Sequence, residues 1–406
     1  MKTENSGIRF NPLRYFISYT TNGLVVMMTT GSVLQTFLLE NGMSEERTGT
    51  YFSIIQALRV LTIFLFSGVS DKIRPVIGVS ALSRALCLPF TVFLLFLPVL
   101  PAGFPFFVML LLAVTTFIFS AAQGAYSVIA YKLPYHIIDM KNYGRFMSIS
   151  GILSGGVCLF GSWLLSYMQG VLGYFPALRY AYLSASVLVL LTTGIILSFR
   201  EKETIDTPKI TEDARPADGK RPHLLAYRPF YALIVPNLFR GFASGIVGMA
   251  VTMGYFTGAI DSAAAAKLVI ISNAVTLLGC SAFAFLSGRM KEKFLLPICA
   301  ASAAVTIPLM LVSGSSGGFL VFYGVTFFFV NIVDYCVPVA VTKIVDYDMA
   351  GVYSGGRMLL HTAGSSLAGA LCIPMLRFFG VLPAAITVSV MYLLFGAGYA
   401  YYLRKQ

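Results

Sequence analysis

Residues 104–131, FPFFVMLLLAVTTFIFSAAQGAYSVIAY, decide the fold class, because this block contains no charged side chain over its whole length. About twenty consecutive apolar residues in an α-helix cross a hydrocarbon core of roughly 30 Å. Similar blocks follow one another along the 406-residue chain, of which 57% is hydrophobic and only 11% is charged. A soluble domain of this length would need more charged residues on its surface. The sequence therefore predicts an all-α polytopic membrane protein.

The apolar blocks predict twelve transmembrane helices in two groups of six. The first group is expected near residues 12–38, 48–70, 75–98, 104–131, 143–168 and 177–199. The second group is expected near residues 228–257, 263–287, 294–313, 318–342, 350–376 and 380–402. The segment between the groups carries charges of both signs and several prolines without apolar periodicity, which is typical of a flexible linker. We therefore expect an N-terminal six-helix bundle over 1–199, a cytoplasmic linker over 200–227 and a C-terminal six-helix bundle over 228–406.

The net charge of +12 is explained by the distribution of the basic residues along the chain. If both termini are cytoplasmic, most Lys and Arg residues fall in cytoplasmic segments, and only Arg47, Arg179 and Arg377 fall outside. This is the positive-inside pattern of membrane proteins. We therefore expect a multi-pass protein of the cytoplasmic (inner) membrane, surrounded by the lipid bilayer and without a nucleic-acid partner.

Cysteine and histidine provide no sign of a metal site. The six cysteines lie singly inside apolar blocks, and the three histidines are scattered along the chain. No CxxC pair or Cys/His cluster has the spacing of metal ligands. No paired acids, and no nucleophile with a base, indicate catalysis. We expect no cofactor, no metal and no enzymatic activity.

Short basic loops recur at matching places in the two groups of spans. FSGVSDKIRP (66–75) follows the second predicted span, and LSGRMKEKF (286–294) follows the eighth. Such repetition indicates a duplicated transporter fold with two pseudo-symmetric halves. The first of these loops resembles the loop between spans two and three of the major facilitator superfamily. There, an Asp and basic residues hold neighbouring helix ends together on the cytoplasmic side. The resemblance implies this gating role for Asp71, Lys72 and Arg74.

Two further segments are similar to the glycoside–pentoside–hexuronide symporters, the melibiose-permease-like branch of that superfamily. LPYHIIDMKNYGR (133–145) is similar to their loop between spans four and five, and KIVDYDMAGVYSGGR (343–357) is similar to their segment before span eleven. The residues that this similarity adds to the gating set are Asp139, Arg145, Asp346 and Arg357. This chain has Val60 and Phe64 where that branch carries the paired acids of its cation site. The sodium-coupled mechanism is therefore not carried over.

Ionisable groups inside apolar spans are costly and mark functional positions. Arg59 and Arg240 both lie about 18 Å from the cytoplasmic side, one in each group of spans. Because Arg binds carboxylate or phosphate bidentately, the two predict a clamp for an anionic substrate. The alternative is neutralisation by a protein acid, and Asp334 is the candidate partner of Arg240. Asp334 is alternatively an ion-coupling group that takes up a proton. Arg84 and Lys267 lie nearer span ends, where we expect them to snorkel without a specific role.

Uncharged polar side chains inside the spans are expected to complete the substrate site. These are Gln56, Gln123, Tyr126, Asn331 and His361. Gln56 lies three residues from Arg59, and Asn331 lies three residues from Asp334, so each shares a helix face with an ionisable group. The alternative for each polar residue is a helix–helix hydrogen bond, which is worth about 0.6 kcal/mol on average.

Together these features predict a secondary active transporter that works by alternating access. The expected substrate is a small polar, anionic molecule: a sugar acid, a carboxylate or a phosphate-bearing metabolite. Because the acids of a sodium site are missing, a proton is the expected co-transported ion of a symporter. A multidrug-type efflux pump is the alternative, and a non-transporting membrane receptor is a further one. We expect the protein to work as a monomer.

Overall fold

The computed structural model describes residues 10–69, 73, 75–97, 106–130, 132–137, 143–200, 234–287, 289–342 and 347–404, and every regular element within these ranges is a helix. The N-terminal part, residues 10–200, contains α2 (Asn11–Thr29), α3 (Gly31–Glu40), α4 (Glu45–Val69), α5 (Val76–Ala85), α6 (Leu88–Phe96), α7 (Phe106–Ile129), α8 (Leu133–Ile137), α9 (Tyr143–Leu172) and α10 (Tyr174–Leu197). The C-terminal part, residues 234–404, contains α12 (Pro236–Gly248), α13 (Ala250–Phe256), α14 (Ser262–Ser287), α15 (Glu292–Val312), α16 (Ser316–Thr342), α17 (Tyr347–Phe379) and α18 (Val381–Arg404).

Most of the predicted spans have a helical counterpart. Among the described residues, 11 helical segments are long and apolar enough to cross a membrane. The remaining predicted span, near 228–257, is described from residue 234 onward as α12 and α13, which meet at Met249 and are each too short to cross alone. The predicted all-α membrane class is therefore confirmed. Except for Arg200, the predicted linker over 200–227 lies outside the described residues.

Two predicted spans are interrupted where local chemistry disfavours a continuous helix. Thr30 is extended, with φ −138° and ψ −174°, and Gly31 has a φ of +60°, so the first span consists of α2 and α3. Glycine adopts this positive φ without the Cβ clash that other residues meet. In the third span α5 ends at Ala85, and Pro89 stands in the first turn of α6. Since proline lacks a backbone N–H and its ring disturbs the preceding turn, a break precedes it.

The outside of the bundle is apolar, whereas its inside contains ionisable groups. Phe106 is 83% exposed and Phe378 is 78% exposed. By contrast, Arg84 is 4%, Arg240 5% and Arg357 3% exposed. Such a surface is unfavourable in water, but lipid acyl chains cover it in a bilayer, where helices satisfy their own backbone hydrogen bonds. The chain is therefore a multi-pass membrane protein.

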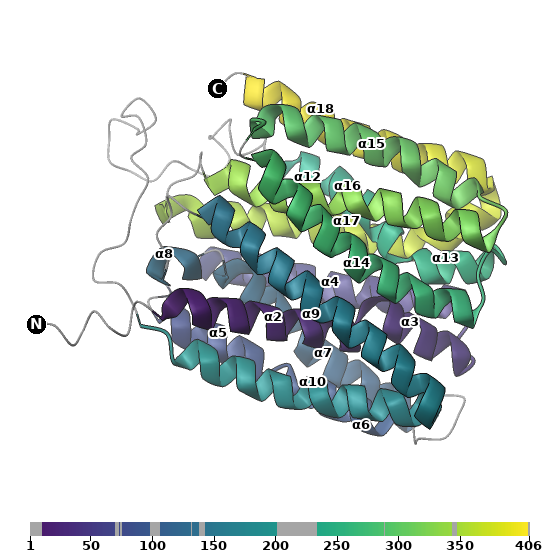
Figure 1. The fold of residues 1–406 in the computed structure, drawn as a ribbon, viewed down its shortest axis with the longest axis horizontal. Coiled ribbons are helices and arrows are strands. Elements are labelled where there is room, and N and C mark those ends of the chain that lie inside the picture. The colour runs from purple at the N-terminus through teal and green to yellow at the C-terminus, as the bar shows by residue number, and fades with distance from the viewer. Residues whose placement is uncertain are drawn as a thin grey trace, which may run out of the picture.

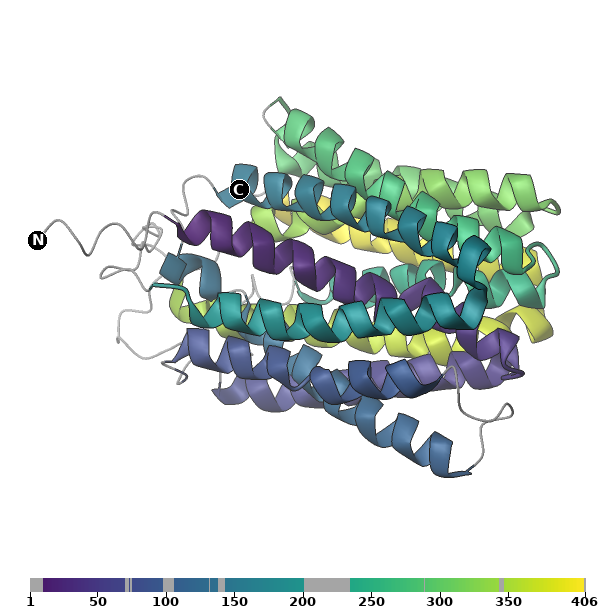
Figure 2. The same ribbon diagram turned by 60° about the horizontal axis from the view of Figure 1, so that its bottom comes forward.

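The helices run along the long axis of the molecule (Figure 1). The helices of the N-terminal part lie in the lower half of that view, and those of the C-terminal part lie in the upper half. α2 begins and α18 finishes at one end of the bundle, which we call the termini end. The opposite end, where α3 and α13 lie, is the distal end. The same alignment of the helices is visible after a 60° turn in Figure 2.

The most extensive contacts between the N-terminal and C-terminal parts are made by two helix pairs: α4 packs on α17, and α9 packs on α14. Glycines permit both contacts. A Cβ added to Gly369 of α17 would lie 3.1 Å from the backbone N of Ser53 in α4. A Cβ added to Gly155 of α9 would lie 3.0 Å from the Cα of Leu277 in α14. Between α4 and α17, Ser53 Oγ donates to Ser366 O at 2.8 Å, and Ser366 Oγ donates to Ser53 O at 3.0 Å. Small residues thus bring the backbones of the two parts together.

We predict that Gly155→Leu lowers the apparent melting temperature of the purified protein in detergent. The added side chain has to displace the backbone of α14, and overpacking of this kind typically costs about 1–3 kcal/mol. The matched control is Gly156→Leu, because a Cβ at Gly156 meets nothing within 4 Å. Thermal denaturation followed by size-exclusion chromatography measures both variants. Equal melting temperatures for the two variants would contradict the close approach of α9 and α14.

Candidate anion-binding site

The N-terminal part holds a buried guanidinium at Arg84, about 12 Å along the helix from the start of α5. Arg84 Nη1 donates to Gln123 Oε1 at 3.1 Å, and Arg84 Cζ lies 3.4 Å from the ring centroid of Tyr126. Gln123 and Tyr126 both belong to α7. A hydrogen bond and a cation–π contact therefore hold the guanidinium against α7.

Arg59 of α4 is the second cation of this site. Arg59 and Arg84 both lie against the stretch of α7 around Gln123 and Gly124, so like charge makes their guanidiniums repel one another. α4 and α7 touch at this level, because a Cβ added to Gly124 of α7 would lie 3.1 Å from Arg59 O. The Nε atoms of Arg59 and Arg84 are both buried, and neither has a hydrogen-bond partner among the described residues. Buried donors without a partner are rare in proteins and call for an explanation.

Within the described residues, no acid pairs with these two arginines. The described acids of the N-terminal part are Glu40, Glu45 and Glu46, which stand at the distal end. Glu45 lies about 21 Å from Arg59 along α4. Two guanidiniums without a counter-ion are costly inside a membrane, and a bound carboxylate or phosphate removes that cost through charge-assisted hydrogen bonds. The arrangement of Arg59 and Arg84 therefore fits an anion.

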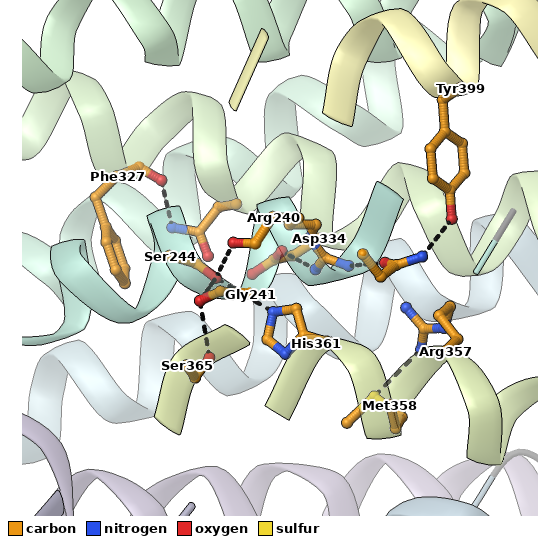
Figure 3. A network of polar contacts seen from close by, with 12 residues as sticks. Arg240, Gly241, Ser244, Phe327, Asp334, Arg357, Met358, His361, Ser365 and Tyr399 are labelled. Carbon is orange, nitrogen blue, oxygen red and sulfur yellow. Dashed lines mark hydrogen bonds and ion pairs between the residues drawn. The ribbon is translucent and has the colours of Figure 1, made fainter. Parts of the chain in front are cut away.

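Arg240 in the C-terminal part has a different environment (Figure 3). Its Nη2 forms an ion pair with Asp334 Oδ1 of α16. Its Nη1 donates to Asn237 Oδ1 at 3.3 Å, and Asn237 Nδ2 donates to Tyr399 OH at 2.9 Å. The charge of Arg240 is therefore neutralised within the protein, which is the alternative to a substrate clamp.

His361 of α17 lies beside the Arg240 network. Its Nε2 is 3.2 Å from Ser244 Oγ of α12, in the network that Figure 3 shows. The arginines whose charge acts on its imidazole are Arg59, Arg240 and Arg357. α17 packs both on α4, which carries Arg59, and on α12, which carries Arg240.

Two further predicted site residues occupy separate positions. Gln56 is partly buried on α4, one turn from Arg59. Asn331 of α16 donates through Nδ2 to Phe327 O at 2.8 Å and accepts from Thr276 Oγ1 of α14 at 3.4 Å. Asn331 thus forms a helix–helix hydrogen bond, whereas Gln56 lies beside the arginine pair.

Most of the predicted gating residues cannot be placed. Asp71, Lys72, Arg74, Asp139 and Asp346 lie outside the described residues. Arg145 belongs to α9, but its side chain is not described. Arg357 is described: it is buried in α17, and its Nη2 donates to Met358 Sδ at 3.5 Å (Figure 3).

Arg84 is the site residue that sequence reasoning missed. The expectation that it snorkels near a span end is wrong, because it is 4% exposed and held by α7. Gln123 and Tyr126 are predicted to contact the substrate. In the structure both residues contact the Arg84 guanidinium and orient it. The sequence contains a feature that points to Arg84, because the predicted spans two to four contain two arginines and no acid to neutralise them.

Comparison with known proteins supports the membrane-transporter architecture. No curated protein matches the chain. The human organic anion transporter MFSD10 (TETRAN) has a TM-score of 0.69 at 13% identity, covering 98% of this chain and 100% of that one. The E. coli fucose:proton symporter FucP has a TM-score of 0.64 at 14% identity, covering 97% of this chain and 98% of that one. A structure of FucP in the outward conformation has the same TM-score of 0.64 at 13% identity and the same coverage of 97% and 98%. At these identities the similarity shows the fold.

The family model described as Major Facilitator Superfamily matches residues 15–369, which is most of the chain. Of the 11 helical segments that are long and apolar enough to cross a membrane, only Val381–Tyr401 lies wholly outside this range. The protein therefore belongs to the Major Facilitator Superfamily.

Proposed function

We propose that this protein is a secondary active transporter of a small organic anion, and that Arg59 and Arg84 bind the anion. The observation that carries the proposal is the pair of neighbouring guanidiniums with unpartnered Nε atoms and no acid beside them in the described residues. Carboxylates, sugar acids and phosphate-bearing metabolites have the charge and the oxygen geometry that such a pair binds. The organic anion transporter among the similar structures is in keeping with this substrate class.

The proposed clamp differs in one member from the pair that the sequence indicates. Arg84 takes the place of Arg240, because Asp334 already neutralises Arg240. Gln123 and Tyr126 fix the direction of the Arg84 guanidinium, so that less side-chain entropy is lost when the anion binds. Gln56 and His361 then lie near enough to contribute to selectivity, whereas Asn331 does not belong to the clamp.

We propose an alternating-access mechanism with twelve spans in two six-helix bundles, 1–199 and 228–406, joined by the linker 200–227. In this proposal α12 and α13 together form the seventh span. The distribution of basic residues supports a cytoplasmic termini end in the cytoplasmic membrane. Membership of the melibiose-permease-like branch stays a prediction from the loop motifs.

Polar contacts between the two parts at the distal end suit a gate. They are Gln35 Nε2 donating to Gly248 O at 2.7 Å, Tyr255 OH donating to Glu40 Oε1 at 2.9 Å, and the ion pair of Arg377 with Glu46. All three join a helix of the N-terminal part to a helix of the C-terminal part. Opening of the distal end has to break all three contacts together. The distal end therefore has two states, closed with these contacts formed and open without them.

The Arg240–Asp334 ion pair provides a place for proton coupling. Protonation of Asp334 removes its negative charge and releases Arg240 from the pair. His361, on which the charge of Arg240 acts, lies next to this change. In this proposal the change of charge at Asp334 is felt at the anion site through His361 of α17, a helix that packs on both α12 and α4.

We predict that Arg59→Gln and Arg84→Gln each weaken anion binding about 10- to 100-fold. A hydrogen bond to a charged group contributes about 1.5–3 kcal/mol, and about 1.4 kcal/mol corresponds to a factor of ten. A thermal-shift panel of carboxylates, sugar acids and sugar phosphates, each beside its uncharged analogue, identifies a stabilising anion with the unmodified protein. Titration of that anion then measures the variants.

The control for this experiment is Arg289→Gln. Arg289 is an exposed arginine whose Cζ lies 3.9 Å from the ring centroid of Phe285, so it also stacks on an aromatic ring, but it lies outside the site. Its replacement is expected to leave anion binding unchanged. Equal binding of charged and uncharged analogues, or unchanged binding in both site variants, would refute the anion site. Stabilisation by uncharged lipophilic compounds alone would favour an efflux pump.

We predict that Asp334→Asn abolishes anion uptake driven by a pH gradient in proteoliposomes but retains exchange of the anion across the membrane. Exchange needs only the binding site and the conformational change, whereas concentration of the anion needs the coupled proton. The double variant Arg240→Gln/Asp334→Asn removes both charges and controls for the unpaired arginine that the single variant leaves. Gradient-driven uptake that persists in both variants would show that the ion pair is structural.

A further inference from the structure

A groove between α4 and α7 opens toward the distal end of the bundle. Its volume is about 680 Å³. Arg47, Ile54 and Leu58 of α4 line one side, and Met109, Ala113 and Phe117 of α7 line the other. Ile54 is 54% exposed and Phe117 is 49% exposed, so the groove belongs to the outer surface that acyl chains cover.

The two helices approach closely beyond the inner end of the groove, and within it Tyr51 of α4 and Thr116 of α7 still join them by a hydrogen bond. The close approach lies at Gly124 of α7, where an added Cβ would be 3.0 Å from Thr62 Cβ and 3.1 Å from Arg59 O. From Arg47 to Leu58 the groove extends about 16 Å along α4. This length is about half of a hydrocarbon core of roughly 30 Å, which corresponds to one leaflet of the bilayer.

The walls of the groove require no polar ligand. Tyr51 OH and Thr116 Oγ1 form a hydrogen bond of 2.8 Å with one another, and Thr50 Oγ1 donates to Glu46 O at 2.8 Å. The remaining lining side chains are apolar, apart from Arg47. An apolar chain therefore fits the groove along its length.

Arg47 places a positive charge at the distal mouth of this groove. It is exposed, and its guanidinium has no ion pair or hydrogen bond among the described residues. The neighbouring Glu46 does not neutralise it, since Glu46 pairs with Arg377 of α17. An occupant with an apolar tail and an anionic head at one end complements both the walls and the mouth.

We propose that this groove binds an anionic phospholipid of the distal leaflet, with one acyl chain between α4 and α7 and the phosphate on Arg47. The length of one leaflet matches an acyl chain that enters from the headgroup layer. The guanidinium binds the phosphate bidentately, whereas the positive headgroup of a zwitterionic lipid reduces this attraction. The site is independent of the proposed transport function, because it uses neither Arg59 nor Arg84.

The test compares lipid retention by delipidated, purified protein in native mass spectrometry. Dioleoylphosphatidylglycerol and dioleoylphosphatidylcholine are added separately to the unmodified protein and to Arg47→Gln. The unmodified protein is expected to retain phosphatidylglycerol about tenfold better than Arg47→Gln does. This factor corresponds to one charge-assisted contact. Retention of phosphatidylcholine is expected to differ little between the two proteins.

Two further variants separate this site from general lipid contact. Arg179→Gln removes another exposed arginine of the distal end that does not line the groove, so its lipid retention should equal that of the unmodified protein. Ala113→Trp fills the groove and should reduce retention of both lipids. In a separate competition experiment, inorganic phosphate should not displace phosphatidylglycerol. Equal retention by Arg47→Gln and the unmodified protein, or an equal loss in Arg179→Gln, would overturn the proposal. Arg47 is exposed, so its replacement is expected to leave the melting temperature without lipid unchanged, and this measurement accompanies each variant.

Discussion

The free-energy cost of a guanidinium inside a hydrocarbon layer governs how the interior of this bundle is built. Arg59, Arg84 and Arg240 lie in membrane-spanning helices, and each needs compensation for lost hydration. The C-terminal part supplies it internally through Asp334, supported by Asn237. Among its described residues, the N-terminal part provides Arg84 with a neutral amide from Gln123 and an aromatic ring from Tyr126. Within the described residues, Arg240 is therefore paired with an acid, whereas Arg59 and Arg84 have no acid beside them, and this is the positive charge that the proposed anionic substrate meets.

The same asymmetry relates substrate binding to movement. α4 carries Arg59 and, along another face, the Ser53 contact to Ser366 of α17. α17 carries His361, whose imidazole experiences the charge of arginines from both parts. Any sliding of α4 against α17 therefore changes the surroundings of the arginine pair, and the small residues along this contact provide a surface on which helices can slide. In the proposed mechanism, substrate binding and conformational change thus involve the same pair of helices.

The distal end of α4 shows how neighbouring residues of one helix serve different surfaces. Glu46 pairs with Arg377 of α17, while Arg47 lines the groove with α7. Successive side chains of an α-helix point about 100° apart, so adjacent charges of opposite sign reach opposite neighbours. The ion pair connects the two parts of the chain, and the arginine remains available to the lipid layer. The proposed gate and the proposed lipid site therefore occupy the same helix end.

The sequence by itself determined that this chain crosses the membrane many times and resembles the major facilitator superfamily. Apolar blocks are matched to the bilayer thickness, so their length is visible without a structure. It also identified Asp334 as the candidate partner of Arg240, but did not decide between pairing and a substrate clamp. Only the tertiary structure shows the ion pair of Arg240 with Asp334 and the burial of Arg84 against Gln123 and Tyr126. The physical reason is that spans apolar on all sides carry little periodic signal of which face turns inward, so rotation, depth and neighbours depend on packing with distant helices.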